Sequence, residues 1–217
     1  VEYYNQIPVI QFMFKSTEAD DIIAYVTQNK YLEDYEKIIL SSDKDFFQLL
    51  DKKTVLYRPI QKEILNKKSI IDKFDIHPVN FAMARAMAGD KSDNIEGIQG
   101  LGLKTISRRF PFLREEKVST FSDVVSHCRK ETQKSDIKAY SAVLEFEDIL
   151  RRNYQMMQLY APLLSISAKS LINETLQNAD QSFNKTELIK MMIKDGFGEI
   201  NFIDLFQHLN KISLDNS

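Results

Sequence analysis

Cysteine is nearly absent from this sequence of 217 residues, and signals for secretion or membrane insertion are missing too. The single cysteine, Cys128, cannot form a disulfide within the chain, so it fits a reducing compartment and a small buried side chain. No apolar run approaches the roughly 18 residues that a membrane-spanning helix needs. The first residues, Val-Glu-Tyr-Tyr, do not resemble a signal peptide. We therefore expect a cytoplasmic protein without a membrane partner.

An excess of charge of one sign is also lacking. The chain has 29 basic and 31 acidic residues, for a formal net charge of −2. Bulk charge thus gives no support for nucleic-acid binding, which would need an uneven distribution of charge and cations that neutralise acidic clusters. His77, His127 and His208 are scattered without the spacing of metal ligands, so structural or surface roles are expected.

Short apolar segments alternate with helical patterns in the first 70 residues, which predicts an α/β sheet with helices on its faces. The apolar triplet 38–40 predicts a strand buried on both faces, as in a parallel sheet. The expected strands are 8–14, 37–42, 54–59 and 61–65, and the expected helices between them are 18–28 and 45–50. Beyond them we expect helices at 69–74, 78–88, 104–110, 121–128, 141–158, 184–194 and 201–209.

Acidic residues stand out by their positions at the ends of these elements. They are Glu18, Asp20 and Asp21 at a helix start, Asp43 and Asp45 after a strand, and Asp90 and Asp93 at a helix end. Ligands bind at the carboxyl ends of strands in open α/β sheets. Asp43 and Asp45 would point to the same side of an extended chain, and Asp90 and Asp93 would share a face of a helical turn.

Carboxylates that meet at one sheet edge repel one another unless cations lie between them. Hard divalent ions such as Mg²⁺ take oxygen ligands, and two of them about 3.5–4 Å apart can stabilise the attacking and leaving oxygens of a phosphodiester. Each acidic group also has an ordinary explanation, as a helix start favoured by the helix dipole, a turn or a helix stop. Their joint occurrence beside a glycine-rich segment favours a metal site.

The glycine-rich segment is Gly97-Ile98-Gln99-Gly100-Leu101-Gly102. Its glycines permit a tight hairpin and a close approach of backbone to a ligand, while Ile98, Leu101 and Leu103 would anchor it in the core. A helix start near Lys104, with the Thr105 hydroxyl, is typical of a phosphate site. Arg108 and Arg109 follow and favour contact with a duplex backbone. The spacing fits neither a dinucleotide-binding fingerprint nor a P-loop.

Three motifs together resemble the signature of the flap endonuclease and 5′–3′ exonuclease family, including phage-type nucleases and the 5′ nuclease domain of bacterial DNA polymerase I. They are Glu-Ala-Asp-Asp at 18–21, Ser-x-Asp-x-Asp at 41–45 and Gly-Asp-x-Ser-Asp-Asn-Ile-x-Gly-Ile-x-Gly-x-Gly-x-Lys-Thr at 89–105. The resemblance implies a PIN-like α/β core with a parallel sheet at 1–75. It also implies a helix–three-turn–helix DNA-binding region at 76–135 and C-terminal helices that pack back on the core at 136–217.

The resemblance also implies roles for single residues. Two Mg²⁺ or Mn²⁺ ions would be held by Glu18, Asp20 and Asp43 (first ion) and by Asp43, Asp45, Asp90 and Asp93 (second ion), with Asp21 behind them. The carbonyls of Ile98 and Leu101 would hold K⁺. DNA would be contacted through Gly97, Gly100, Gly102, Lys104, Thr105, Arg108 and Arg109.

The implied reaction is hydrolysis of DNA near a 5′ end, a flap or a single-strand/duplex junction, in replication or repair. RNA primers are a further implied substrate, and a monomer, with replication proteins as candidate partners, is expected in the cytoplasm, or in the host cytoplasm for a phage protein. The family begins with an Asp-bearing strand that does not precede Val1 here, so we expect an incomplete first metal site. A phosphatase that uses Asp-x-Asp and a junction-binding protein without catalysis stay open as alternatives.

Overall fold

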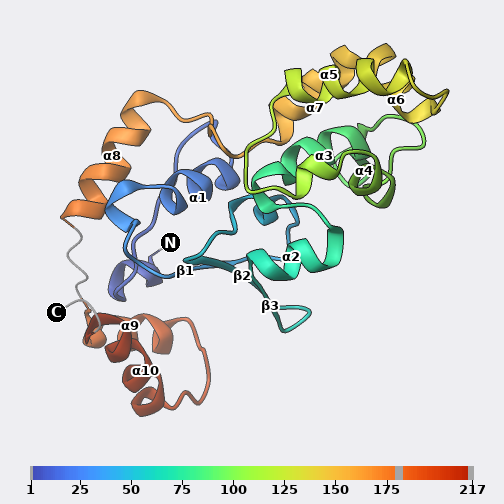
Figure 1. Ribbon diagram of the computed structural model, residues 1–217. Coiled ribbons are helices and arrows are strands. Elements are labelled where there is room, and N and C mark those ends of the chain that lie inside the picture. Colours follow the sequence, from blue (N-terminus) through green and yellow to red (C-terminus); the bar gives the residue numbers. More distant parts are fainter. Residues whose placement is uncertain (1, 179–182, 215–217) are drawn as a thin grey trace. The chain divides into compact units, whose positions relative to one another are not determined.

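The computed structural model describes residues 2–178 and 183–214, which belong to two compact units (Figure 1). The central unit is Thr17–Leu164, and the terminal unit combines the residues up to Ser16 with those from Ser165 onward. This division differs from the three predicted domains, 1–75, 76–135 and 136–217. One reason is that a helix of the third predicted domain, α7 (Glu147–Met157), packs against α3 (Phe81–Ala88) of the second.

A sheet of three strands, in the order β1-β2-β3, lies in the central unit. Its strands are β1 (Lys37–Leu40), β2 (Thr54–Arg58) and β3 (Glu63–Leu65), close to three of the predicted strands. The strands β1 and β2 are parallel, with Lys37 opposite Thr54, and β3 returns antiparallel to β2. Ile39, Leu56 and Leu65 are buried in the main hydrophobic core. The predicted α/β class is confirmed for this unit.

Two predictions about strands are wrong. The strand β1 is not buried on both faces, because Ile38 and Leu40 are 70% and 67% exposed and only Ile39 is covered. An apolar triplet signals burial on two faces, but nothing in the described residues covers the second face. Residues 8–14 form no strand, since they pair with no other strand in the described ranges, and Met13 is 83% exposed.

Helices build the rest of the central unit (Figure 1). The α-helices besides α3 and α7 are α1 (Ala19–Thr27), α2 (Lys67–Phe74), α4 (Leu103–Arg109), α5 (Phe121–Thr132) and α6 (Lys138–Glu145). Single 3₁₀ turns are η2 (Lys30–Leu32), η3 (Asp45–Leu49), η4 (Pro78–Asn80) and η5 (Pro111–Arg114). Apart from Arg85, the α3 helix is apolar all round, and it is buried along seven of its residues, 81–87, which is typical of a helix inside a core.

One long helix predicted at 141–158 is divided in two at Phe146, whose backbone leaves the helical region. The two halves have different packing partners, since α6 packs on α5 and α7 packs on α3. The chain must therefore turn between them. Cys128 on α5 is fully buried, as predicted, and burial raises the pKa of its thiol to about 12.

The terminal unit contains η1 (Tyr3–Gln6), α8 (Ile166–Gln177), α9 (Lys185–Lys194) and α10 (Phe202–Leu214). The Tyr3 hydroxyl donates hydrogen bonds to Asp195 and to the carbonyl of Met191, and thereby ties the first residues to α9. The helices predicted at 184–194 and 201–209 are confirmed, but α8 was not predicted. None of the helices in the described part of the chain is long and apolar enough to cross a bilayer.

A short hairpin joins α3 to α4 through β4 (Gly89–Asp90) and β5 (Ile95–Glu96). The backbones of Gly89 and Gly97 touch, so that a Cβ on Gly97 would overlap the carbonyl of Ala88. The buried Asn153 of α7 donates through its side-chain amide to the carbonyls of Ala86 and Glu96, at 3.1 and 2.7 Å. The close contact between Gly89 and Gly97 and the two hydrogen bonds from the Asn153 amide together fix the hairpin to α3 and α7.

We expect Gly97→Ala to lower the free energy of unfolding by about 2 to 3 kcal/mol, because the new methyl group overlaps rigid backbone. Gly102→Ala is the matched control. Gly102 has an ordinary extended backbone and open space around it, so this change should cost about 1 kcal/mol or less. Urea unfolding followed by circular dichroism measures both, and equal losses would contradict the close-contact role of Gly97.

Candidate active site

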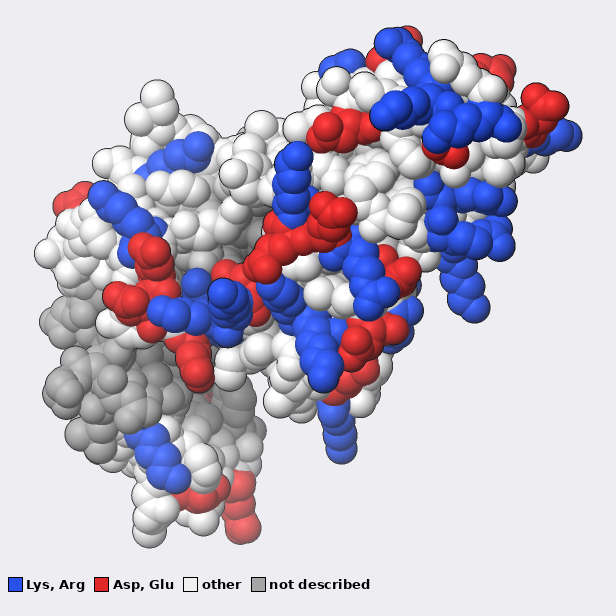
Figure 2. Space-filling model, viewed as in Figure 1, with Lys and Arg blue, Asp and Glu red and all other residues white. Residues whose placement is uncertain are grey.

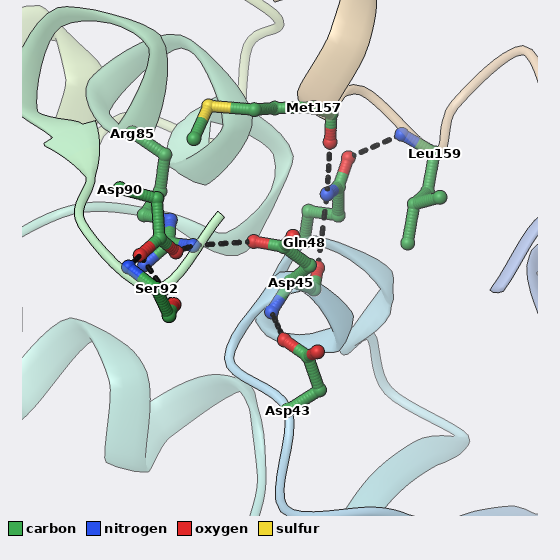
Figure 3. A network of polar contacts seen from close by, with 8 residues as sticks. All are labelled: Asp43, Asp45, Gln48, Arg85, Asp90, Ser92, Met157 and Leu159. Atoms are coloured by element: carbon green, nitrogen blue, oxygen red, sulfur yellow. Dashed lines mark hydrogen bonds and ion pairs between the residues drawn. The ribbon is translucent and has the colours of Figure 1, made fainter. Parts of the chain in front are cut away.

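The loop after β1 carries two of the predicted metal ligands, Asp43 and Asp45 (Figure 3). Asp43 accepts a hydrogen bond from the backbone N–H of Asp45 at 2.8 Å, and its own N–H donates to the Ser41 hydroxyl at 3.1 Å. This tight turn leads into η3, where Phe46 and Phe47 are buried and anchor the loop. Asp43 is exposed and Asp45 is half-buried, so the two carboxylates have different environments on one short turn.

A buried arginine joins two of the predicted ligands. Arg85 of α3 places its Nη2 2.8 Å from Oδ1 of Asp45, and the same nitrogen bonds Oδ2 of Asp90 (Figure 3). The other oxygen of Asp90 accepts from the N–H and the hydroxyl of Ser92, at 2.8 and 2.5 Å. The sequence analysis did not identify Arg85. Its one signal was a charged residue within the apolar run 81–88.

Gln48 holds the loop of Asp45 in position, and it was also missed. Its amide nitrogen donates to the carbonyl of Asp45 at 2.9 Å and to that of Met157 at 3.0 Å. Its amide oxygen accepts from the N–H of Leu159 at 2.7 Å. The end of α7 therefore positions Asp45 (Figure 3), although 109 residues separate Gln48 from Met157.

The carboxylates affect one another electrostatically. Burial is the main cause that raises the pKa of Asp45 to about 6; Arg85 opposes this shift, and the charges of Asp43, Asp90 and Asp93 contribute to it. Burial also raises the pKa of Asp20, with contributions from Asp43, Glu18, Asp21 and Asp93. The acidic groups of α1, the β1 loop and the segment after α3 thus share one electrostatic environment, as predicted from their places in the chain.

Asp90 shows the opposite shift. Burial acts to raise the pKa of this carboxyl, but the hydrogen bonds from Ser92 and the charge of Arg85 outweigh burial, so the pKa lies below its usual range. Asp90 is therefore ionised at neutral pH, which is the state that a carboxylate ligand of a metal ion needs. Asp45, with a pKa of about 6, is close to the point where it gains a proton.

The donor set fits a hard divalent cation by its chemistry, because it consists of carboxylate oxygens that crowd negative charge. Its geometry is less complete: within residues 2–178 and 183–214, no three His, Cys, Asp or Glu side chains are arranged to hold one ion. The predicted ligand set stays a prediction: Glu18, Asp20, Asp43, Asp45, Asp90 and Asp93. Asp21, predicted to lie behind these ligands, accepts a hydrogen bond from the N–H of Leu163 at 2.9 Å.

The predicted DNA-contacting segment lies next to Asp90. Ile98 and Leu101 are buried, which confirms their role as anchors, and the N–H of Leu101 donates to the carbonyl of Ile98 at 3.0 Å. Gly100 is exposed and has a positive φ of 82° that favours glycine, while Gly102 precedes the first residue of α4. The predicted roles of Gly97, Gly100, Gly102 and the two carbonyls in binding DNA or K⁺ stay predictions.

Basic side chains follow on α4 and α5. Lys104 and Arg108 are exposed, Thr105 and Arg109 are half-buried, and Arg129 and Lys130 of α5 are exposed. Figure 2 shows a group of Lys and Arg side chains over the part of the central unit that carries α4, α5 and α6. The chain as a whole has a net charge of −2, so this basic group is a local feature of the surface and does not follow from bulk charge.

Comparison with known proteins supports the family resemblance. Residues 2–75 match the family described as 5′-3′ exonuclease, N-terminal resolvase-like domain. The chain is 36% identical over 110 residues to a 5′-3′ exonuclease of Aquifex aeolicus, a match that covers 46% of this chain and 38% of that protein. It is 32% identical over 107 residues to a thermostable DNA polymerase I of Thermus thermophilus, covering 49% of this chain and 13% of the polymerase. The matches therefore span well under half of each relative.

The fold has a counterpart among solved structures. The flap endonuclease of bacteriophage T5, solved as a pseudo-enzyme–product complex with DNA and metal ions, matches with a TM-score of 0.63 and 19% sequence identity. The match covers 77% of this chain and 62% of the phage protein, which confirms the predicted fold class. The sequence motifs, the matched domain and the fold agree, and together they support a place for this chain in the flap endonuclease and 5′–3′ exonuclease family.

Proposed function

We propose that this protein is a structure-specific 5′ nuclease that hydrolyses DNA phosphodiesters near a 5′ end, a flap or a junction with the help of divalent metal ions. The observation that carries the proposal is the gathering of carboxylates from three separate segments at one end of β1, where they shift each other's pKa. The neighbouring glycine-rich segment 97–102 and the basic residues of α4 would bind DNA beside these carboxylates. The phage relative in complex with DNA and metal ions supports this reading.

Mg²⁺ suits the proposed site because it prefers oxygen ligands and keeps several waters. Glu18 and Asp43 are exposed and Asp20 is half-buried, so these three can reach a first ion. Asp45 and Asp90, together with the exposed Asp93, would hold the second ion. Two bound ions would supply positive charge for the attacking and leaving oxygens. Gln48 and Ser92 keep Asp45 and Asp90 in position for this role.

The proposed DNA surface continues from the glycine-rich segment 97–102 along α4. Lys104, Thr105 and Arg108 offer side chains for phosphate oxygens, with Arg109 beside them. Such contacts position a duplex without reading its sequence, which fits an enzyme that recognises DNA structure. We further propose that the glycine-rich segment 97–102 binds K⁺ through the carbonyls of Ile98 and Leu101 and that the bound K⁺ contacts a phosphate.

A second candidate function is duplex or junction binding without catalysis. It is favoured by one specific observation: in the described ranges, no three His, Cys, Asp or Glu side chains are arranged for a metal ion, and Arg85 is already paired with Asp45 and Asp90. This candidate predicts salt-sensitive duplex binding with no cleavage, whereas the nuclease proposal predicts both binding and cleavage.

Asp43→Asn and Asp90→Asn should each reduce Mg²⁺-dependent cleavage of a 5′-labelled flap duplex by about 100-fold or more, because each removes a charged ligand of the site. Asp136→Asn, an exposed change outside the carboxylate cluster, should cleave like the parent. If the parent binds the duplex but does not cleave it, the second candidate function is correct. If the parent neither binds nor cleaves the duplex, the nuclease proposal is rejected.

Lys104→Ala and Arg108→Ala should weaken binding of any DNA duplex. Each should also flatten the slope of log K against log salt concentration by about 0.9 for every phosphate that the variant no longer neutralises. Lys194→Ala removes an exposed cation of the terminal unit and should leave the slope unchanged. Fluorescence anisotropy at several salt concentrations measures the slope, and an unchanged slope in both α4 variants would contradict the proposed surface.

Divalent-ion affinity should fall as pH drops through about 6, the pKa of Asp45 in the metal-free protein. This pKa is raised above its unfolded value, so the proton stabilises the folded, metal-free protein at acidic pH, and that stabilisation is lost as pH rises through the folded pKa. A divalent ion must displace the proton, so calorimetry at pH 6 in two buffers should detect proton release. Asp45→Asn should abolish this release; release that persists would show that another group supplies the proton.

A further inference from the structure

Arg85 is the most buried charged residue of the site. It lies on α3 between the fully buried Ala84 and Ala86 and is itself 8% exposed. Its guanidinium reaches Asp45 from the β1 loop and Asp90 from the hairpin. One positive charge thus faces two carboxylates, and it holds the two segments together.

The geometry of this cluster is not that of an optimised structural ion pair. A guanidinium binds carboxylate best through two parallel N–H···O bonds, but here Nη2 alone serves both carboxylates. The buried Nε of Arg85 has no hydrogen-bond partner among the described residues. A buried donor left unpaired is costly, so the arrangement stabilises the fold less than a fully bonded fork would.

Asp45 and Asp90 do not depend on Arg85 alone for their positions. Gln48 fixes the backbone of Asp45, and Ser92 holds one oxygen of Asp90 through two hydrogen bonds. The oxygens that Arg85 contacts are Oδ1 of Asp45 and Oδ2 of Asp90, and Oδ2 is the oxygen of Asp90 that Ser92 leaves free. The guanidinium therefore takes up the ligand atoms that a divalent ion would need.

We propose that Arg85 is an internal counter-cation that competes with a divalent ion for Asp45 and Asp90 and thereby weakens metal binding at this half of the site. The proposal rests on the proposed function, because it assumes that the carboxylates bind metal. In the metal-free protein Arg85 offsets part of the repulsion between the two carboxylates. A divalent ion binds there only when its concentration is high enough to displace the guanidinium.

The test compares Mn²⁺ binding to the full chain for the parent and for Arg85→Met, by calorimetry and by electron paramagnetic resonance of free Mn²⁺ at pH 7.5. We expect Arg85→Met to bind one ion at least tenfold more tightly than the parent. Its metal-free form should melt at a lower temperature, and Mn²⁺ should reverse this loss. Lys67→Met removes a cation paired with Glu116 at 2.6 Å outside the site and should bind Mn²⁺ like the parent.

Unchanged or weaker Mn²⁺ binding in a folded Arg85→Met protein would overturn the proposal, because Arg85 would then support the ligands rather than compete for them. Arg85→Lys serves if the methionine variant does not fold. Lysine keeps the charge but loses the planar fork, so about threefold tighter binding is expected and parental affinity would also overturn the proposal.

Asp43→Asn distinguishes a failure of the proposed competition by Arg85 from a failure of the proposed metal site. Among the described residues, Arg85 forms its ion pairs with Asp45 and Asp90 and not with Asp43, so unchanged Mn²⁺ binding in this variant would reject the metal site itself.

Discussion

Repulsion among carboxylates at the end of β1 is the constraint on which the rest of this structure depends. Burial and neighbouring charge raise the pKa of Asp45 and of Asp20, which shows that gathering these groups costs free energy. The protein offsets part of this cost with Arg85 and with hydrogen bonds from Ser92. A folded state that keeps such a cluster is poised to bind a cation, since a bound cation removes the repulsion.

The elements around the cluster are built to hold it rigidly. The α3 helix is buried along most of its length, and it carries Arg85 and leads directly into Asp90. The close contact of Gly89 with Gly97 and the amide of Asn153 fix the hairpin against α3 and α7. The same contacts set the position of the hairpin relative to the carboxylates. A proposed phosphate-binding segment and a proposed metal site are thus parts of one packed unit.

The sequence predicted those features that depend on local pattern. The class of the fold, most helices, the anchoring of Ile98 and Leu101 and the gathering of the acidic residues follow from periodicity, turn residues and the ends of strands. Features that depend on distant partners were not predictable. Arg85 and Gln48 act on residues 40 and 109 positions away, and the exposure of Ile38 depends on what covers β1. The roles of the six carboxylates in binding metal are still predictions.

The central claim is that these carboxylates bind divalent ions at the end of β1, and a crystal grown with Mn²⁺ tests it most directly. The account predicts anomalous peaks within about 2.0–2.6 Å of carboxylate oxygens there, with one ion near Asp43 and Asp20. It also predicts that a second ion appears beside Asp45 and Asp90 only at higher Mn²⁺ concentration, with the Arg85 guanidinium moved away. A fully soaked crystal without a peak at these carboxylates, or with peaks only elsewhere on the chain, would contradict it.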